Sequence, residues 1–138
     1  MAAGMPRCLI VDDDRDGREG YAEYLRAFGF DVDECEDGES AWTRMKVQKP
    51  DILLVDLQLP GRSGWQLIAD LRDTPAFAEM PIVAVSACVF PDDQKRAEEA
   101  GCSVFLPKPS VPGDVLSELR RLLKMRGPAR QKAGMSNA

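Results

Sequence analysis

The chain has 138 residues, of which 44% are apolar and 30% charged, a composition typical of one globular domain with a single core. Its formal net charge of −5 argues against non-specific binding to nucleic acid. No apolar run is long enough to span a membrane, and the N-terminus lacks the basic and apolar segments of a secretory signal, so we expect a cytoplasmic protein.

The cysteines show no metal-binding pattern. They form no C-x-x-C pair, and because the chain contains no histidine, a zinc site would need all four cysteines to converge. We interpret them as small buried hydrophobic residues. They are Cys8, Cys35, Cys88 and Cys102.

In the first third of the chain, short apolar runs alternate with amphipathic segments. Residues 8–11 are apolar and branched and stop at acids, which predicts a strand buried on both faces. Apolar and aromatic residues at helical spacing over 21–28 predict an amphipathic helix. Residues 30–35 alternate like a strand, and a second helix is expected between residue 37 and Pro50.

The same alternation continues through the middle of the chain. Residues 52–55 form another apolar strand, and the proline and glycines of residues 57–64 predict a loop. Apolar residues over 65–71 define a third helix. Residues 82–85 predict a fourth buried strand, and residues 92–100 a short, heavily charged helix whose charges are most simply a solvated face.

The last elements are a fifth strand at residues 104–106 and a helix whose first turn holds Pro112. Five strands alternating with five helices require right-handed crossovers, which predicts a doubly wound α/β fold around a parallel sheet covered on both faces. We expect residues 6–126 to form the domain. Residues 127–138 have no apolar period and are expected to be a flexible tail or a truncated linker.

Charged and polar residues directly follow four of the predicted strands. Ligands of an open parallel sheet bind at the carboxyl ends of its strands, so these side chains should meet at one edge. Acids gathered there repel one another and need a cation, and an all-oxygen set of ligands favours Mg²⁺ over zinc. A carboxylate can attack phosphorus, while a lysine and a hydroxyl stabilise the transferred group. The residues are Asp12, Asp13, Asp14, Asp56, Ser86 and Lys108.

Four motifs in this order resemble the receiver domains of response regulators, the CheY-like superfamily of two-component phosphorelay signalling. The resemblance spans residues 7 to about 125. It implies the flavodoxin-like fold, a five-stranded parallel sheet in the order 2-1-3-4-5 flanked by five helices. The motifs are Val11-Asp12-Asp13, the run from Asp51 through Asp56 to Gly61, Val85-Ser86-Ala87, and the run from Ala100 to Lys108-Pro109.

The resemblance also implies a role for each matching residue. Asp56 would be the phosphoacceptor, and Ser86 and Lys108 would contact phosphoryl oxygens. Asp13, Asp56 and the backbone carbonyl of Gln58 would bind Mg²⁺ directly, with Asp12 acting through metal-bound water. Phe105 would be the aromatic switch, and the Lys108–Pro109 peptide bond is expected to be cis.

Several residues also have a plainer interpretation. Asp14 and Asp37 suit helix caps or turns, and Trp65 is interpreted as a packing residue. By resemblance, the charged residues that start the first helix would face a phosphodonor protein. They are Arg15, Asp16, Arg18 and Glu19.

The resemblance implies a signalling protein that catalyses only its own phosphorylation and dephosphorylation. Its donor would be a sensor histidine kinase or a histidine phosphotransfer protein, and its target another protein, bound through the fourth helix, fifth strand and last helix. Direct binding to nucleic acid or a membrane is not expected. Two alternatives stay open: a haloacid-dehalogenase-like phosphatase with Asp12 as nucleophile, and an interaction scaffold of this fold that never carries phosphate.

Overall fold

The computed structural model describes residues 4–133 apart from 88 and 89, with side chains described up to residue 125. Strands and helices alternate along the chain, as the sequence predicts. The strands are β1 (Arg7–Val11), β2 (Asp31–Cys35), β3 (Ile52–Asp56), β4 (Ile82–Ser86) and β5 (Val104–Pro107). The helices are α1 (Arg15–Ala27), α2 (Gly38–Val47), α3 (Gly64–Arg72), the 3₁₀ turn η1 (Pro75–Phe77), α4 (Pro91–Ala100) and α5 (Pro112–Ala133).

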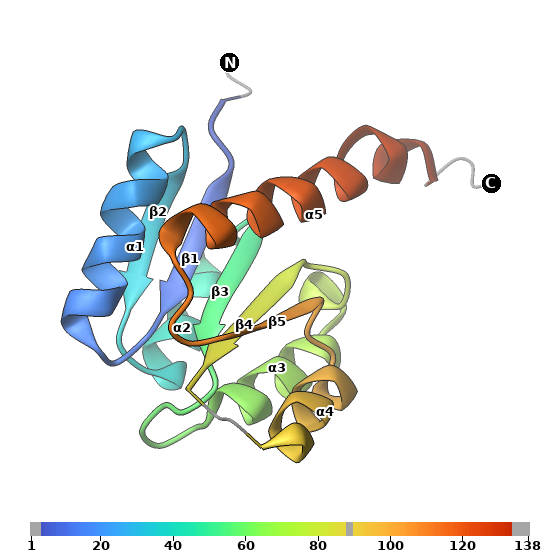
Figure 1. Ribbon diagram of the computed structural model, residues 1–138. Coiled ribbons are helices and arrows are strands. Elements are labelled where there is room, and N and C mark those ends of the chain that lie inside the picture. The colour runs from blue at the N-terminus through green and yellow to red at the C-terminus, as the bar shows by residue number, and fades with distance from the viewer. Residues whose placement is uncertain (1–3, 88–89, 134–138) are drawn as a thin grey trace.

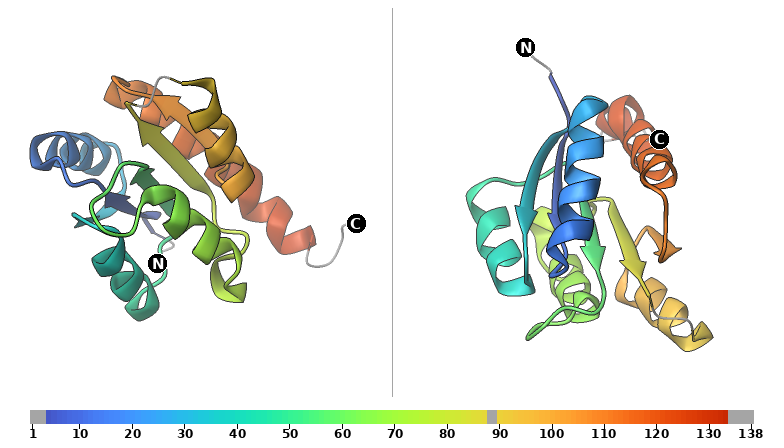
Figure 2. Two further views of the ribbon diagram at one scale, coloured as in Figure 1. Left: turned by 90° about the horizontal axis from the view of Figure 1, so that it is seen from below. Right: turned by 60° about the vertical axis from the view of Figure 1, so that its left-hand side comes forward.

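The five strands form one parallel sheet in the order β2-β1-β3-β4-β5, which confirms the predicted fold class. Helices α1 and α5 cover one face of the sheet, and α2, α3 and α4 cover the other (Figures 1 and 2). Each face therefore has its own apolar core. Every residue of β3 and β4 is buried, because these strands lie inside the sheet and have helices on both sides.

Polar side chains and one glycine set the helix boundaries. Asp14 and Asp37 accept hydrogen bonds from the amides of Gly17 and Ser40, so both acids are N-caps, as the sequence predicts. Helix α4 ends at Gly101, whose φ of 114° is a left-handed conformation that suits glycine. The Lys108–Pro109 peptide bond is cis, as expected.

Three details differ from the sequence analysis. Phe28 is 46% exposed although it continues the apolar spacing of α1, because it lies at the C-terminal end of the helix. Its ring lies tilted against that of Tyr24 and near the guanidinium of Arg120. The turn η1 was not predicted. The backbone of α5 continues to Ala133, so the helix does not end where the apolar stripe does; helical geometry needs no apolar period, only backbone hydrogen bonds.

The cysteines that the structure describes agree with their interpretation as packing residues. Cys8 and Cys35 are buried free thiols, and Cys102 is partly buried, whereas Cys88 lies outside the described residues. Among the residues that the structure covers, no helix is both long and apolar enough to cross a membrane.

Candidate functional site

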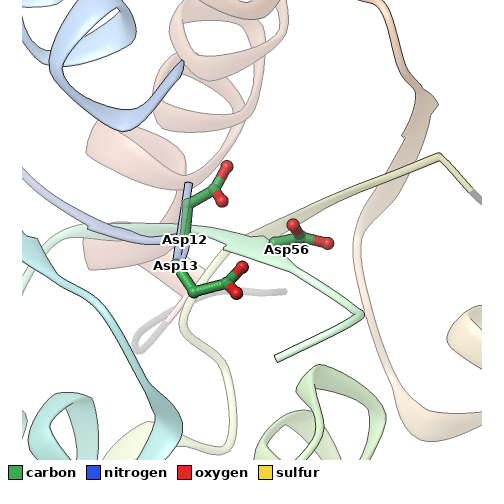
Figure 3. Close-up of side chains that lie close together, drawn as sticks. All are labelled: Asp12, Asp13 and Asp56. Atoms are coloured by element: carbon green, nitrogen blue, oxygen red, sulfur yellow. The ribbon is translucent and has the colours of Figure 1, made fainter. Parts of the chain in front are cut away.

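Three carboxylates meet at the carboxyl edge of the sheet. Asp12 and Asp13 follow β1, and Asp56 is the last residue of the neighbouring β3. Figure 3 shows the three side chains lying close together at the ends of the two strands. One carboxylate oxygen from each lies within 4.8 Å of the others, so the residues are close enough to share one cation.

The carboxylate of Asp12 is held on both of its oxygens. One oxygen accepts the amide N–H of Asp14 at 2.9 Å, and the other lies 3.1 Å from the ammonium of Lys108. Asp12 is only 4% exposed, so these contacts replace the water that its oxygens would otherwise bind. Asp13, in contrast, is exposed and completes the cluster from the solvent side.

Asp56 is oriented in the same manner. Its Oδ1 accepts the amide N–H of Gln58 at 2.9 Å, and its Oδ2 lies 3.1 Å from the same Lys108 ammonium. Lys108 follows β5 and is 96 residues from Asp12 in sequence, yet it bridges Asp12 and Asp56. These residues are far apart in the chain but meet because the carboxyl ends of parallel strands lie at one edge of the sheet.

The cluster contains more acidic groups than basic ones. Burial raises the pKa of Asp56 above its ordinary value of 3.8, and the hydrogen bonds from Gln58 and Lys108 lower it by less. Burial lowers the pKa of Lys108, but the hydrogen bond to Asp56 and the charges of Asp56 and Asp12 outweigh it, so the net shift is upward. Lys108 therefore stays protonated at neutral pH, and three acids face one cation.

The remaining predicted site residues lie on β4 and β5 and in the loop after β3. Ser86 ends β4 with a fully buried side chain, and its carbonyl accepts the amide N–H of Lys108 at 2.8 Å. Gln58, the second residue after β3, is exposed. Phe105 is partly buried on β5 and packs against the core that α2, α3 and α4 cover. Trp65 packs against the same core, in agreement with its interpretation as a packing residue.

A cavity of about 350 Å³ opens beside the cluster, between α1 and the loop that follows β5. The hydroxyl of Tyr21 donates a hydrogen bond to the carbonyl of Ser110 at 2.8 Å and ties the two walls together. Solvent and small molecules therefore have space next to Lys108. The lining residues are Asp12, Asp14, Gly17, Gly20, Tyr21, Lys108, Pro109, Ser110 and Pro112.

The side chain of Arg18 lies in a different environment from the one expected from sequence. Arg18 was expected to face a donor protein, but its side chain is only 14% exposed. Its guanidinium instead donates to the backbone carbonyl of Asp12 at 2.8 Å and pairs with Glu34 of β2. No motif signals this contact, because it depends on how α1 packs against β2.

The donor atoms suit Mg²⁺. All three ligand candidates are carboxylates, and with Lys108 they carry a formal excess of two negative charges. Hard divalent cations prefer such oxygen ligands, and the chain offers no imidazole that would favour zinc.

We expect Asp56→Asn to raise the melting temperature of the protein by a few degrees in EDTA at pH 7. A raised folded-state pKa means that the folded protein holds this proton more tightly than the unfolded chain does. The resulting stabilisation is present below the ordinary value of 3.8 and is lost as the pH rises through the folded value, whereas asparagine is neutral throughout.

Thermal unfolding in EDTA between pH 4 and pH 8, monitored by circular dichroism, checks this expectation. The difference in melting temperature between Asp56→Asn and wild type should grow with pH. A wild type that stays more stable than the variant at pH 8 would show that the ion pair with Lys108 outweighs the cost of the buried charge.

Comparisons with known proteins identify the whole domain. Residues 8–120 match the family model described as the response regulator receiver domain. The chain is 33% identical over 117 residues to a gliding motility regulatory protein of Myxococcus xanthus, covering 85% of this chain and 15% of that protein. It is 31% identical over 125 residues to the phosphate regulon transcriptional regulatory protein PhoB of Pseudomonas aeruginosa, covering 91% and 55%. The chain thus spans only part of these two relatives.

Solved structures agree on the fold. The chemotaxis response regulator CheY4 of Vibrio cholerae superposes with a TM-score of 0.81 at 24% identity, over 86% of this chain and 99% of that one. The signal receiver domain of a signal transduction histidine kinase from Syntrophus aciditrophicus superposes with a TM-score of 0.84 at 24% identity, over 89% and 93%.

Proposed function

This chain belongs to the response regulator receiver domain family, and from that premise we propose that it accepts a phosphoryl group from a phosphohistidine donor onto Asp56 with Mg²⁺. The observation that carries the proposal is the convergence of Asp12, Asp13 and Asp56, with Lys108 bridging two of them. Receiver domains are signalling modules of two-component systems. Any catalysis would be confined to the phosphorylation and dephosphorylation of Asp56 itself.

The contacts of Asp56 support its role as the nucleophile. The Gln58 amide and the Lys108 ammonium fix the two carboxylate oxygens, so the group is held in one orientation. An oxygen of Asp56 would attack phosphorus, the P–N bond of the donor would break, and the imidazole would leave with the electron pair. The Lys108 ammonium and the Ser86 hydroxyl are the groups proposed to bind the transferred oxygens.

Asp12, Asp13, Asp56 and the backbone carbonyl of Gln58 are the groups proposed to hold Mg²⁺. When bound, the ion would neutralise charge on the acids and on the phosphoryl group. The charge excess of the cluster supports this assignment, because the raised pKa of Asp56 marks a carboxylate that Lys108 alone does not compensate. The cavity beside Lys108 gives a phosphodonor space to approach.

We further propose that the phosphorylated domain binds a downstream protein through α4, β5 and α5. Strand β5 lies at the edge of the sheet; three of its residues are partly buried and Pro107 is exposed. Phe105 on this strand would be the switch that responds to the phosphoryl group. We do not propose direct binding to nucleic acid, because the net charge of −5 would repel its phosphates.

We expect Lys108→Met to slow phosphorylation of Asp56 by roughly 10- to 100-fold, because one preorganised cation is lost from the transferred group. The variant should also lose about 2 kcal/mol of stability in EDTA, since two buried acids lose their shared partner. Acetyl phosphate labelling followed by intact-protein mass spectrometry measures the rate, and urea unfolding measures the stability.

Lys95→Met is the matched control, because Lys95 is exposed on α4 and the substitution removes the same charge. It should leave both quantities nearly unchanged. Equal effects of the two substitutions would mean that net charge, and not the position of Lys108, governs the reaction.

Beryllofluoride, which mimics a phosphoryl group, tests the proposed function as a whole. With Mg²⁺ present, it should change the tryptophan fluorescence or the amide chemical shifts of the wild type but not those of Asp56→Asn. Unchanged spectra of the wild type would favour the scaffold that never carries phosphate. The phosphatase alternative with Asp12 as nucleophile has no support from the family match.

A further inference from the structure

The backbone of Asp12 is held on both sides by contacts that come from two other elements. The amide N–H of Asp12 donates to the carbonyl of Cys35, the last residue of β2, at 3.1 Å. The carbonyl of Asp12 accepts from the guanidinium of Arg18 on α1 at 2.8 Å. The Asp12 carbonyl belongs to the peptide group that joins the α-carbons of Asp12 and Asp13, so its contact with Arg18 restrains the direction of both side chains.

The side chain of Arg18 is itself held in place by Glu34. Its Nε lies 3.1 Å from one oxygen of Glu34, and the other oxygen of Glu34 lies 3.3 Å from Arg26, which also donates to the carbonyl of Val32 at 2.9 Å. The side chains of Arg18 and Glu34 are 14% and 23% exposed. A guanidinium held at two points with little solvent contact has few alternative positions, so it is a rigid support for the Asp12 carbonyl.

We infer that Arg18, oriented by Glu34, is a positioning residue that fixes the Asp12–Asp13 peptide so that both carboxylates face Asp56 and bind the cation. The inference rests on the proposed function, because it assigns Arg18 a role in metal binding. Supporting groups behind metal ligands commonly affect metal affinity by 10- to 100-fold.

Positioning and simple electrostatics predict opposite results when Arg18 loses its charge. Removing a cation near a cluster of acids should strengthen cation binding if charge alone matters. Removing the support of the Asp12 carbonyl should weaken binding. The two carboxylates would then be more mobile in the free protein and would lose more conformational entropy when the cation binds. The sign of the change therefore distinguishes the two effects.

The test uses Mn²⁺ as the probe, with free ion measured by electron paramagnetic resonance. Arg18→Met keeps an apolar stem for packing, and we expect its Kd for Mn²⁺ to be about 10-fold weaker than that of the wild type. Arg15→Met is the control: Arg15 starts the same helix and carries the same charge, but its side chain is 79% exposed and pairs with Glu19 one turn away. Its Kd should stay within about twofold of the wild type.

Arg18→Lys preserves the charge, but one ammonium does not reproduce the two-point hold on Asp12 and Glu34, so its Kd should lie between those of wild type and Arg18→Met. Circular dichroism checks folding, and if Arg18→Met does not fold, Arg18→Lys decides. Binding by Arg18→Met as tight as by Arg15→Met, or binding by Arg18→Lys equal to wild type, would overturn the inference. A wild type that binds no Mn²⁺ would instead overturn the proposed function.

Discussion

The Asp56→Asn variant should incorporate no detectable phosphoryl group from acetyl phosphate in Mg²⁺, a loss of at least about 1000-fold. The side-chain amide has the shape of the carboxylate but is a poor nucleophile toward phosphorus. Asp56 is the last residue of β3, and Gln58 and Lys108 hold its two carboxylate oxygens in one orientation. Intact-protein mass spectrometry over time measures the incorporation.

Asp14→Asn is the control for that experiment. Asp14 lies in the same acidic run, but its carboxylate caps α1 by accepting the amide N–H of Gly17. Asparagine is an equally good N-cap, so phosphorylation should continue at nearly the wild-type rate. Labelling of Asp56→Asn at the wild-type rate would mean that another residue is the phosphoacceptor.

Gly64→Ala should destabilise the protein by about 3 kcal/mol, because α3 begins against the backbone of Asp56. A Cβ at this position would lie 2.4 Å from the carbonyl oxygen of Asp56 and 2.6 Å from the Cα of Leu57. These are backbone atoms at the end of a central strand, so they cannot move without disturbing the site. The amide of Gly64 also donates to the carbonyl of Leu57 at 2.9 Å, which ties α3 to the strand.

Urea unfolding measures the loss, and Gly20→Ala is the matched control. A Cβ on Gly20 of α1 would meet no atom within 4 Å, and alanine in a helix interior is favoured over glycine by about 0.5–1 kcal/mol. The same chemical change should therefore stabilise one helix and disrupt the other. Equal stability of the two variants would mean that the α3 start tolerates a shift away from Asp56.

The fold and the acidic cluster could be predicted from sequence for one physical reason. Parallel strands buried on both faces leave continuous apolar runs, and the residues after such runs meet at one edge of the sheet. From that rule, Asp12, Asp56 and Lys108 are predicted to be neighbours although Asp12 and Lys108 are 96 residues apart in sequence. Their chemistry then follows from residue type, because carboxylates in contact need a cation.

The contacts that depend on side-chain packing could not be predicted in this way. Arg18 and Glu34 have no spacing that signals their pairing, and only the packing of α1 beside β2 brings them together. Phe28 continues a helical period, but the helix has ended before the period does. Local patterns predict which face of an element is apolar, whereas the partner on that face depends on the tertiary structure.

The most direct test of the proposed function is to map the phosphoryl group on the wild-type protein. Labelling with acetyl phosphate in Mg²⁺, acid quenching, proteolysis and tandem mass spectrometry locate the modified residue. We predict one phosphoryl group, on the peptide that contains Asp56, and its loss when EDTA replaces Mg²⁺. A phosphoryl group on Asp12, or labelling that does not depend on a divalent cation, would contradict the proposal.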